Sequence, residues 1–407
     1  MMLSVRLAWR NLFRNTRRTL LTCTLITSSL MVIILVDGMV LGMVEVMVGG
    51  ITHTLEGEAQ VNRKGFRENL EPELRLMKPD PITEALKNDE RVSGFAPRVM
   101  VGGMIASTYN TSGGLIYGVD YQAEQQVSKL KQALIQGSYL TGAKREILIG
   151  KLLAELLEVD LGDRIIISAA RVGTSDITQE LFRVQGIFEF GPEEMDENFA
   201  FVNLEVAQAM LGMEGQLHQI AIRFNDPEDA KDSKLPTLVN LREAEVEALG
   251  WLDLQPSVGG MIEMSNYAST IAGAVLFVLT SLGVINSMFM SIYERIYEFG
   301  VAKAIGTTPG QIISLVLFEA FFLALIACLL GIVLAYGASS YFEAHGVPMG
   351  RMEVAGVLLD GNLYTKVEAY QFVVFPVYVT LLTLAAAIYP AIFASRIVPS
   401  QALQRAL

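Results

Sequence analysis

The side chains that usually carry out acid–base, nucleophilic or metal chemistry are few in this chain and scattered along it. Neither the three histidines, His53, His218 and His345, nor the two cysteines fall into a Ser/His/Asp or Cys/His arrangement. The acidic run 193–197 lacks the histidine or cysteine companions of a metal site, so we expect a solvated loop there. The sequence therefore predicts no catalytic residues, no metal site and no cofactor bound by this chain.

The most specific motif lies at residues 294–310, between two long apolar stretches. Its charged side chains are interleaved with apolar ones, and Gly306 can end a helix. Thr308 then suits an N-cap and Pro309 the first helical position, while Gln311 completes a Thr-x-x-Gln capping box. We therefore expect a short, sharply bounded helical element. Such an element is typical both of a knob that receives force and of a simple connection with well-formed caps.

A second group of residues lies in the first apolar stretch and forms a predicted cargo or dimer face. Gly38 and Gly42 have the Gly-x-x-x-Gly spacing that lets two helices approach closely. Met39 and Met43 share a helical face, and flexible side chains suit acyl chains or varied apolar partners, although ordinary helix packing explains them as well. Asp37 is costly if it faces lipid, so we expect it at a dimer interface or wet cavity, or else near the outer headgroups.

The composition indicates that these residues belong to membrane segments. The chain is 52% hydrophobic and 18% charged, which is less charge than a soluble chain of its length usually carries. About 20 helical residues cross a hydrocarbon core, and four apolar stretches each have at least 25 residues: 20–44, 264–293, 312–342 and 369–395. Glu319 is the single charge in the third stretch, and we expect it at the inner headgroup boundary.

The distribution of charge predicts the orientation. Residues 1–19 contain five arginines and no acid, whereas residues 45–263 contain 35 acids against 20 bases. Because basic flanks stay in the cytoplasm and long acidic domains can be translocated, we expect both termini in the cytoplasm and the long insertion on the other side of the membrane. The first stretch lacks a small-x-small cleavage site, which argues against a cleaved signal peptide.

Strand-like and helix-like runs alternate within the insertion, which favours an α/β or α+β domain. We expect an outer lobe near residues 120–215 inserted into an inner one. The strand-like runs are Glu58–Val61, Val99–Ser107, Leu115–Gly118, Arg164–Ser168, Phe182–Phe188 and Ile220–Phe224. The helix-like runs are Pro81–Leu86, Gly150–Leu157, Leu204–Leu211 and Leu238–Leu249.

The predicted fold is a membrane protein with four transmembrane α-helices, one and then three, and a large α/β periplasmic domain between the first and second. Its predicted segments are a cytoplasmic basic interfacial helix at 1–18, transmembrane helices at 19–48, 264–293, 311–342 and 369–395, a periplasmic domain at 49–263, a cytoplasmic coupling segment at 294–310, a short periplasmic loop at 343–368 and a cytoplasmic tail at 396–407.

Several runs of sequence resemble those of a known family. The runs EFGVAKAIGTTPGQI, LAWRNLFRNTRRTLL, YPAIFASRIVPSQALQRAL and ILIGKLLAELLEVDLGDRIII are similar to those of MacB-like (FtsX-like, mechanotransmission type) ABC transporter permeases. The layout is closest to the lipoprotein-releasing LolC and LolE permeases. Gln401 stands where the family's terminal motif usually carries an acid, which weakens any charged contact assumed there.

The resemblance implies a dimer of permeases, identical or paralogous, on two ATPase subunits that bind ATP and Mg²⁺. No Gly-x-x-x-x-Gly-Lys-Ser/Thr phosphate loop occurs in the sequence, so we expect the ATPase to be a separate polypeptide and this chain to be a non-catalytic permease. The resemblance also implies the residues that couple to the ATPase: Glu294, Arg295, Glu298, Phe299, Gly300, Lys303, Ala304 and Gly306.

The resemblance leaves three functions open. Extraction of a lipoprotein or another lipid-linked cargo fits the layout, although the stretch Ala169–Glu180 is short and polar where LolC-like permeases carry a loop that recruits a chaperone. The alternatives are MacB-like export of a peptide, toxin or small molecule, and FtsX-like regulation of a periplasmic enzyme without transport. The acidic insertion disfavours a nucleic-acid partner.

Overall fold

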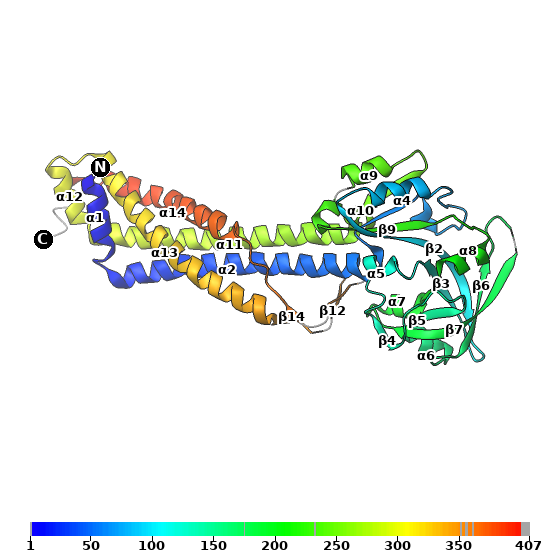
Figure 1. Cartoon of the computed structure of the whole chain (residues 1–407). Coiled ribbons are helices and arrows are strands. Elements are labelled where there is room, and N and C mark those ends of the chain that lie inside the picture. The colour runs from blue at the N-terminus through cyan, green and yellow to red at the C-terminus, as the bar shows by residue number, and fades with distance from the viewer. Residues whose placement is uncertain are drawn as a thin grey trace. The chain divides into compact units, whose positions relative to one another are not determined.

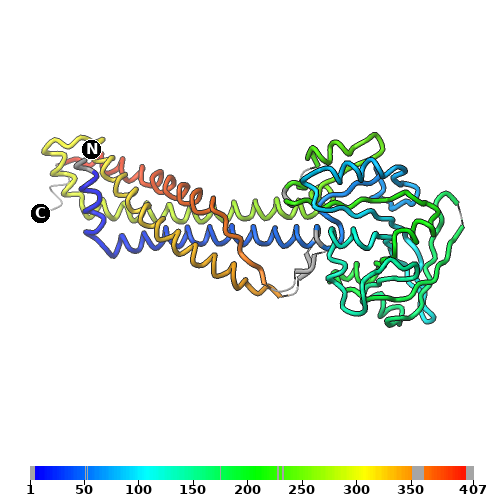
Figure 2. The backbone as a smooth tube through the Cα atoms, viewed as in Figure 1, coloured from blue at the N-terminus to red at the C-terminus, as the bar shows by residue number. Residues whose placement is uncertain are grey.

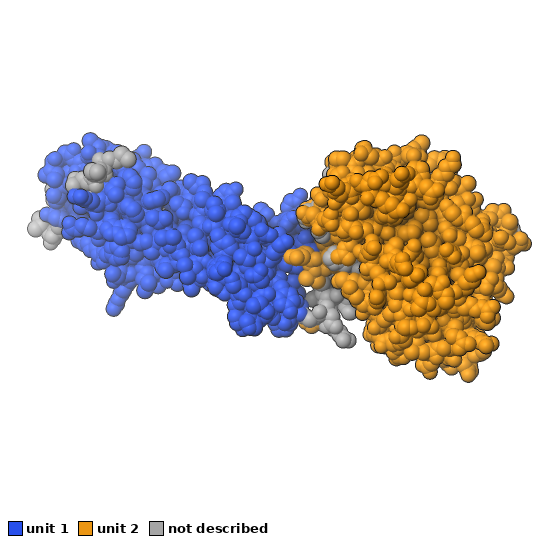
Figure 3. Space-filling model, viewed as in Figure 1, with its two compact units in different colours: residues 1–44, 262–349, 361–407 blue, residues 45–261, 350–360 orange. Residues whose placement is uncertain are grey.

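The computed structural model describes residues 2–174, 176–231, 233–350, 352–354, 357–359 and 362–399. The chain divides into two units, coloured separately in Figure 3. Unit 1 comprises residues 1–44, 262–349 and 361–407, and unit 2 comprises residues 45–261 and 350–360. Gln401 and the rest of the predicted tail beyond residue 399 lie outside the described residues.

Unit 2 is built around a ten-stranded sheet. The strand order is β10-β1-β9-β2-β3-β8-β5-β7-β4, and β6 pairs with both β2 and β7. The strands are β1 (Ala59–Arg63), β2 (Val92–Ala106), β3 (Thr111–Val119), β4 (Leu134–Gly137), β5 (Glu146–Gly150), β6 (Arg164–Ala170), β7 (Ile177–Phe188), β8 (Phe199–Asn203), β9 (Gln219–Phe224) and β10 (Val246–Gly250).

Six of these strands pair in a closed cycle, in the order β2-β3-β8-β5-β7-β6 and back to β2. Strand β2 has 15 residues, and its first half pairs with β9 while its second half pairs with β3 and β6. The outer and inner lobes expected from the sequence are therefore two parts of one continuous sheet, and both use β2.

The helices of unit 2 are short, and one of them differs from the prediction. They are α3 (Phe66–Asn69), α4 (Asp80–Lys87), α5 (Glu124–Val127), α6 (Lys151–Leu157), α7 (Glu193–Asn198), α8 (Leu204–Leu211), α9 (Pro236–Leu241) and α10 (Trp251–Leu254), with a π-helical turn at Thr52–Glu56 and a 3₁₀ turn at Pro227–Ala230. The predicted helix Leu238–Leu249 is wrong, because its second half is β10. Pairing of β10 with β1 outweighs the helical spacing of its apolar residues.

Half of the polar stretch Ala169–Glu180 is strand. Strands β6 and β7 stay paired up to Ala170 and Ile177, so the connection is confined to residues 171–176. Ile177, at the start of β7, is 70% exposed. The stretch is thus short, as its sequence indicates, but its end carries an exposed apolar side chain.

A buried ion pair ties α5 to the sheet of unit 2. Arg98 on β2 donates to both carboxylate oxygens of Glu124, at 2.9 and 2.6 Å, and to the carbonyl oxygen of Leu55 at 2.7 Å. Both charged side chains are almost fully buried. Such a pair is held by geometry and additional hydrogen bonds, so loss of one partner would leave an uncompensated charge in the core.

A buried histidine joins β2, α3 and the segment before α4. His218 Nδ1 accepts a hydrogen bond from the Met100 N–H at 2.9 Å, and Nε2 lies 3.0 Å from the carbonyl oxygen of Pro72. The ring also stacks on Phe66, with centroids 4.9 Å apart. Because Nδ1 accepts, the proton sits on Nε2 and the ring is neutral. Burial lowers the pKa of His218 accordingly.

Unit 1 consists mainly of long helices: α1 (Met2–Leu12), α2 (Thr16–Ile51), α11 (Pro256–Glu294), α12 (Ile296–Ala304), α13 (Pro309–His345) and α14 (Gln371–Ser395). Four of them, α2, α11, α13 and α14, are long and apolar enough to cross a membrane. Between α13 and α14, β11 (Val347–Pro348) pairs with β14 (Asn362–Leu363), and β12 (Met352–Val354) pairs with β13 (Val357–Leu359). The helix expected over residues 1–18 is divided, because α1 ends at Leu12 and α2 starts at Thr16.

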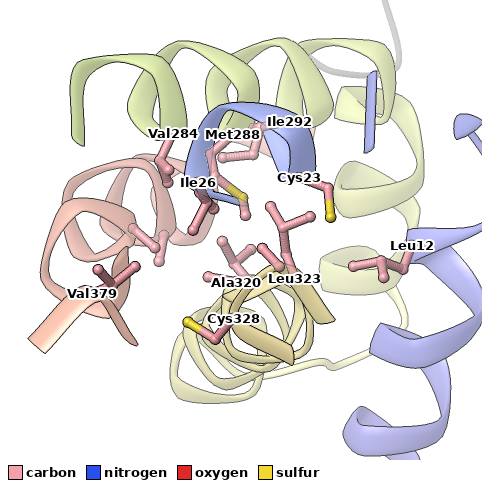
Figure 4. Close-up of a cluster of buried hydrophobic side chains, with 14 of the residues drawn as sticks. Leu12, Cys23, Ile26, Val284, Met288, Ile292, Ala320, Leu323, Cys328 and Val379 are labelled. Carbon is pink, nitrogen blue, oxygen red and sulfur yellow. The ribbon is translucent and has the colours of Figure 1, made fainter. Parts of the chain in front are cut away.

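Apolar side chains from all the helices of unit 1 meet in one cluster (Figure 4). Ile26 of α2, Met288 of α11 and Leu323 of α13 are among its buried members. Hydroxyl groups join the same helices: Thr27 Oγ1 donates to the Ala327 carbonyl at 3.0 Å. In lipid, where apolar burial between helices gains little, such close packing and hydroxyl bonds are the expected source of association.

Candidate functional site

The segment singled out in the sequence folds as α12, between two breaks in the backbone. Arg295 leaves helical geometry, with φ −117° and ψ 19°, and so separates α12 from α11. Beyond α12, Gly306 adopts a φ of 101°, which glycine tolerates and other residues rarely adopt. Gln311 Oε1 accepts a 3.0 Å hydrogen bond from the Thr308 N–H, as the predicted capping box requires.

Arg295 lies at the centre of an ion-pair network that joins α12 to α13 and to the α1–α2 region. Its Nη1 donates to Glu319 Oε1 on α13 at 2.7 Å, and its Nε donates to Glu298 Oε2 at 3.1 Å. Asn11 Nδ2 of α1 donates to the same Glu319 oxygen at 2.6 Å. Arg14, between α1 and α2, contacts Glu298 at 2.5 Å. Figure 1 shows α1 and α12 side by side at one end of unit 1.

Opposite charges keep the Arg295 and Glu298 side chains ionised. Burial by itself would lower the pKa of Arg295, but the carboxylates of Glu319 and Glu298 outweigh it and raise that pKa. Burial by itself would raise the pKa of Glu298, but hydrogen bonds from Arg295 and Arg14 lower it. The charges on Arg295 and Glu298 are therefore both present at neutral pH.

Two more contacts hold the ends of the segment. Glu294 Oε2 accepts from Arg18 Nη1 at 2.8 Å, which ties the end of α11 to α2. Lys303 Nζ donates to the carbonyl oxygens of Ser395 and Ile397, each at 2.8 Å, which ties α12 to the end of α14. The segment is thus tied directly to α2, α13 and α14, and through Glu319 to α1.

These contacts show that the charged residues of the segment bind within unit 1. Of the eight predicted coupling residues, the four charged ones bind other parts of unit 1, Phe299 and Gly300 are buried, and Ala304 and Gly306 are exposed. A charge at the junction of apolar helices loses hydration, so it is stable where a partner replaces the water. Glu319 is buried for the same reason, as a partner of Arg295.

The most exposed residues of α12 and of its C-terminal end are Tyr297, Ala304 and Ile305, and sequence reasoning missed two of them. Tyr297 and Ala304 are seven residues apart and share a helical face, which ends in Ile305. Ile305 is 81% exposed. Ile305 lies between the last turn of α12 and Gly306, so its side chain does not continue the packed face of the helix. This position next to a helix-ending glycine is the sequence signal that could have identified Ile305 as exposed. We call Tyr297, Ala304 and Ile305 the α12 tip.

The predicted cargo or dimer face on α2 is partly covered by the segment that leads into α14, drawn in orange in Figure 2. Asp37 Oδ2 accepts hydrogen bonds from Tyr370 Oη at 2.7 Å and from Gln371 Nε2 at 2.8 Å. Asp37 therefore has partners within its own chain, at the start of α14. Its predicted place at a dimer interface, in a wet cavity or near the outer headgroups stays a prediction.

Gly38 and Gly42 admit an irregular segment rather than a second helix. The Lys366 N–H donates to the Gly38 carbonyl oxygen at 2.9 Å, and a Cβ at Gly42 would overlap the carbonyl oxygen of Tyr364. Thr365 Oγ1 donates to the Ser339 carbonyl at 2.8 Å and so fixes the same segment to α13. We call residues 364–366 the strap. The Gly-x-x-x-Gly spacing signals close approach correctly, but the approaching group is the strap.

Met39 and Met43 lie next to the glycines and are half-buried. Each methionine directly follows one of the two glycines, and one residue along a helix is a rotation of about 100°. The methionines therefore face a different side of α2 from the glycines that contact the strap. Of the five residues predicted on this face, the two glycines are buried, and Asp37, Met39 and Met43 are half-buried.

The acidic run 193–197 is ordered as part of α7, which corrects the expected solvated loop. Asp196 is buried, and its carboxylate accepts from the Phe190 and Gly191 N–H groups at 2.7 and 3.0 Å. Burial raises the pKa of Asp196 despite these two hydrogen bonds. Among the residues that the structure describes, no three His, Cys, Asp or Glu side chains gather as metal ligands would.

Two family models match the chain. The MacB-like periplasmic core domain matches residues 19–234, more than half of the chain, and the FtsX-like permease C-terminal model matches residues 270–399. The chain therefore belongs to the FtsX-like ABC transporter permeases that carry a MacB-like periplasmic core domain. Permease subunits of this class are typically non-catalytic.

Individual relatives and one solved structure are similar to parts of the chain. The chain is 25% identical over 336 residues to the lipoprotein-releasing system transmembrane protein LolC of Xylella fastidiosa, covering 78% of each chain. It is 29% identical over 137 residues to the macrolide export ATP-binding/permease protein MacB of Rhodopseudomonas palustris, covering 33% of this chain and 21% of that one. The periplasmic region of MacB from Actinobacillus actinomycetemcomitans aligns with a TM-score of 0.36 and 11% identity, over 50% of this chain and 94% of that one.

Proposed function

We propose that this chain crosses a bacterial inner membrane four times, through α2, α11, α13 and α14, with unit 2 in the periplasm and α12 at the cytoplasmic surface. The lengths and apolar composition of the four helices support this arrangement. The contrast between five arginines in residues 1–19 and an excess of acids in residues 45–263 supports the direction.

In this proposal a separate ATPase subunit, which binds ATP and Mg²⁺, docks on the α12 tip, and a second permease completes the complex. The observation that carries the proposal is the network from Arg295 to Glu319, Glu298 and Asn11. A force applied to the apolar tip reaches α1 and α13 through charged contacts rather than through a flexible loop. In the chain, α2 leads into unit 2 and α11 follows it. Displacement of these two helices would therefore move unit 2.

The cargo that we propose is a lipoprotein or another lipid-linked molecule in the inner membrane. The relative named as a lipoprotein-releasing system protein aligns over 78% of this chain. Met39 and Met43 supply a flexible, partly open apolar surface on α2 that suits an acyl chain. Unit 2 would then supply the moving part that releases the cargo.

Replacing Ile305 by aspartate tests the docking step. The variant places a charge on the α12 tip, so we expect the ATPase subunit to be lost from the purified complex while the permease still inserts. Val398→Asp is the matched control, because Val398 is also an exposed apolar residue, beyond the end of α14. Retention of the ATPase by Ile305→Asp would show that the tip is not its docking site.

Cargo is tested by purifying the complex from its native membrane and identifying lipid-modified proteins by mass spectrometry. We expect lipoproteins to crosslink to photoreactive groups at Met39 or Met43 and to be lost when ATP is hydrolysed. Stoichiometric capture of a periplasmic hydrolase or receptor without any lipid-modified cargo would favour a regulatory complex and contradict transport.

A further inference from the structure

An apolar groove of about 510 Å³ runs along unit 1 between α13 and α14. Four residues of α13 between Ser314 and Phe321 and four residues of α14 between Leu381 and Ile388 line it, and the Ser314 hydroxyl is the polar side chain among them. The ion-pair network, the α12 tip and the strap use none of these residues. The groove is therefore a separate feature of unit 1.

The groove lies toward the α12 end of both helices. Ser314 comes soon after the start of α13 at Pro309, and Ile388 lies two turns before the end of α14 at Ser395. If α12 is at the cytoplasmic surface, as in the proposed function on which this inference rests, the groove opens into the inner leaflet of the membrane. An acyl chain of that leaflet lies at the same depth.

An exposed arginine, Arg396, lies where the groove approaches the membrane surface. Leu384, Ile388 and Ile392 form one stripe along α14 at intervals of four residues, and Arg396 follows at the same interval, just past the end of the helix. At a rise of about 1.5 Å per residue, Arg396 lies about 12 Å beyond Ile388. It is exposed, and among the described residues no hydrogen bond or ion pair involves its guanidinium.

The surroundings of Arg396 leave room for a ligand. The carbonyl oxygens of Ser395 and Ile397 already accept from Lys303, so Arg396 is not needed to cap α14. On the facing helix, the stripe through Ser314 reaches Gly310, which has open space on its Cβ side. A lipid headgroup next to Arg396 would therefore meet no side chain from Gly310.

We propose that this groove and Arg396 together bind an anionic phospholipid of the inner leaflet, with one acyl chain between α13 and α14 and the phosphate on Arg396. Charge complementarity favours a lipid over a second copy of the chain, because a helix packed into the groove would bring its apolar side chains toward Arg396. Basic pockets between transmembrane helices on the cytoplasmic side are a known setting for anionic headgroups.

The test uses tryptophan fluorescence and lipids brominated on their acyl chains, which quench nearby indoles. Ile388→Trp supplies a probe at the rim of the groove, and Met290→Trp supplies a control on α11, since both positions are about half exposed near the same end of unit 1. Both probes are made in a Trp9→Phe background, since Trp9 lies 5.3 Å from Phe322 of α13. The full complex is reconstituted in vesicles that contain either brominated phosphatidylglycerol or brominated phosphatidylcholine as a minor component.

We expect phosphatidylglycerol to quench the Ile388→Trp probe about fivefold more effectively than phosphatidylcholine, which corresponds to about 1 kcal/mol from one arginine at the membrane surface. The Met290→Trp control should show no preference. Arg396→Gln should abolish the preference and Arg396→Lys should keep most of it.

Equal quenching of the groove probe by the two lipids would overturn the anionic-lipid site. Protection of the groove probe from both lipids, with the control still quenched, would mean that protein covers the groove and would also overturn it. Absence of quenching at both probes would instead contradict the membrane placement of α11 and α14, and with it the proposed function.

Discussion

Replacing Glu319 by glutamine should loosen α12 from the rest of unit 1. Glu319 and Arg295 are 2.7 Å apart, and their side chains are 8% and 12% exposed. Removing one partner of a buried ion pair usually costs about 3–5 kcal/mol, because the other charge stays buried without compensation. Glutamine keeps one acceptor for Arg295 and Asn11, so we expect the lower end of that range, about 3 kcal/mol.

A nearby exposed pair supplies the matched control. Arg14 contacts Glu298 with side chains that are 61% and 40% exposed. Exposed ion pairs contribute about 0–1 kcal/mol, so Arg14→Gln should have little effect although it removes a contact to the same helix. A double variant, Arg295→Met with Glu319→Leu, removes both buried charges together and should restore much of the lost stability.

The assay is amide hydrogen exchange followed by mass spectrometry on peptides that cover residues 296–304. A loss of about 3 kcal/mol in the free energy of opening α12 corresponds to roughly a hundredfold faster exchange, whereas Arg14→Gln should change it by less than about fivefold. ATPase stimulation by cargo should fall with the same ranking. Unchanged exchange in Glu319→Gln, or equal changes in Glu319→Gln and Arg14→Gln, would refute the claim that the buried pair holds α12.

Two further predictions concern the strap and the buried histidine. Gly42→Val places a side chain against the Tyr364 carbonyl and should release the strap. The assay is disulfide formation between cysteines introduced as Ser339→Cys and Thr365→Cys, which Gly42→Val should reduce. Undiminished crosslinking would contradict this packing. Because burial lowers the pKa of His218 in the folded chain, the unfolded chain binds the proton first as pH falls below about 6.5, so the free energy of unfolding should decrease from there downward. Trp251 fluorescence during thermal unfolding of the full chain measures this, and His218→Gln should flatten the pH dependence; a slope that survives in that variant would assign it to another group.

Local patterns predicted the features that depend on neighbouring residues. The four long apolar helices follow from hydropathy summed over more than 20 residues, and the capping box follows from the spacing of Thr308 and Gln311. Strand β10 escaped prediction because its sequence fits a helix equally well, and only pairing with β1 makes it a strand. Whether a short segment of this kind becomes a strand depends on the strand that it can pair with, and that partner lies far away in the sequence.

The candidate site divides in the same way. The sequence alone indicated a short helical element that ends near Gly306, and glycines on α2 that accommodate a close neighbour. Each of these features depends on backbone conformation or on the absence of a side chain. The tertiary structure alone decided what the charges do. Asp37 meets Tyr370 across 333 positions, and Arg295 finds Glu319 on a different helix. A charged side chain looks the same in the sequence whether it faces solvent or a buried partner, because desolvation and pairing arise only when the helices pack.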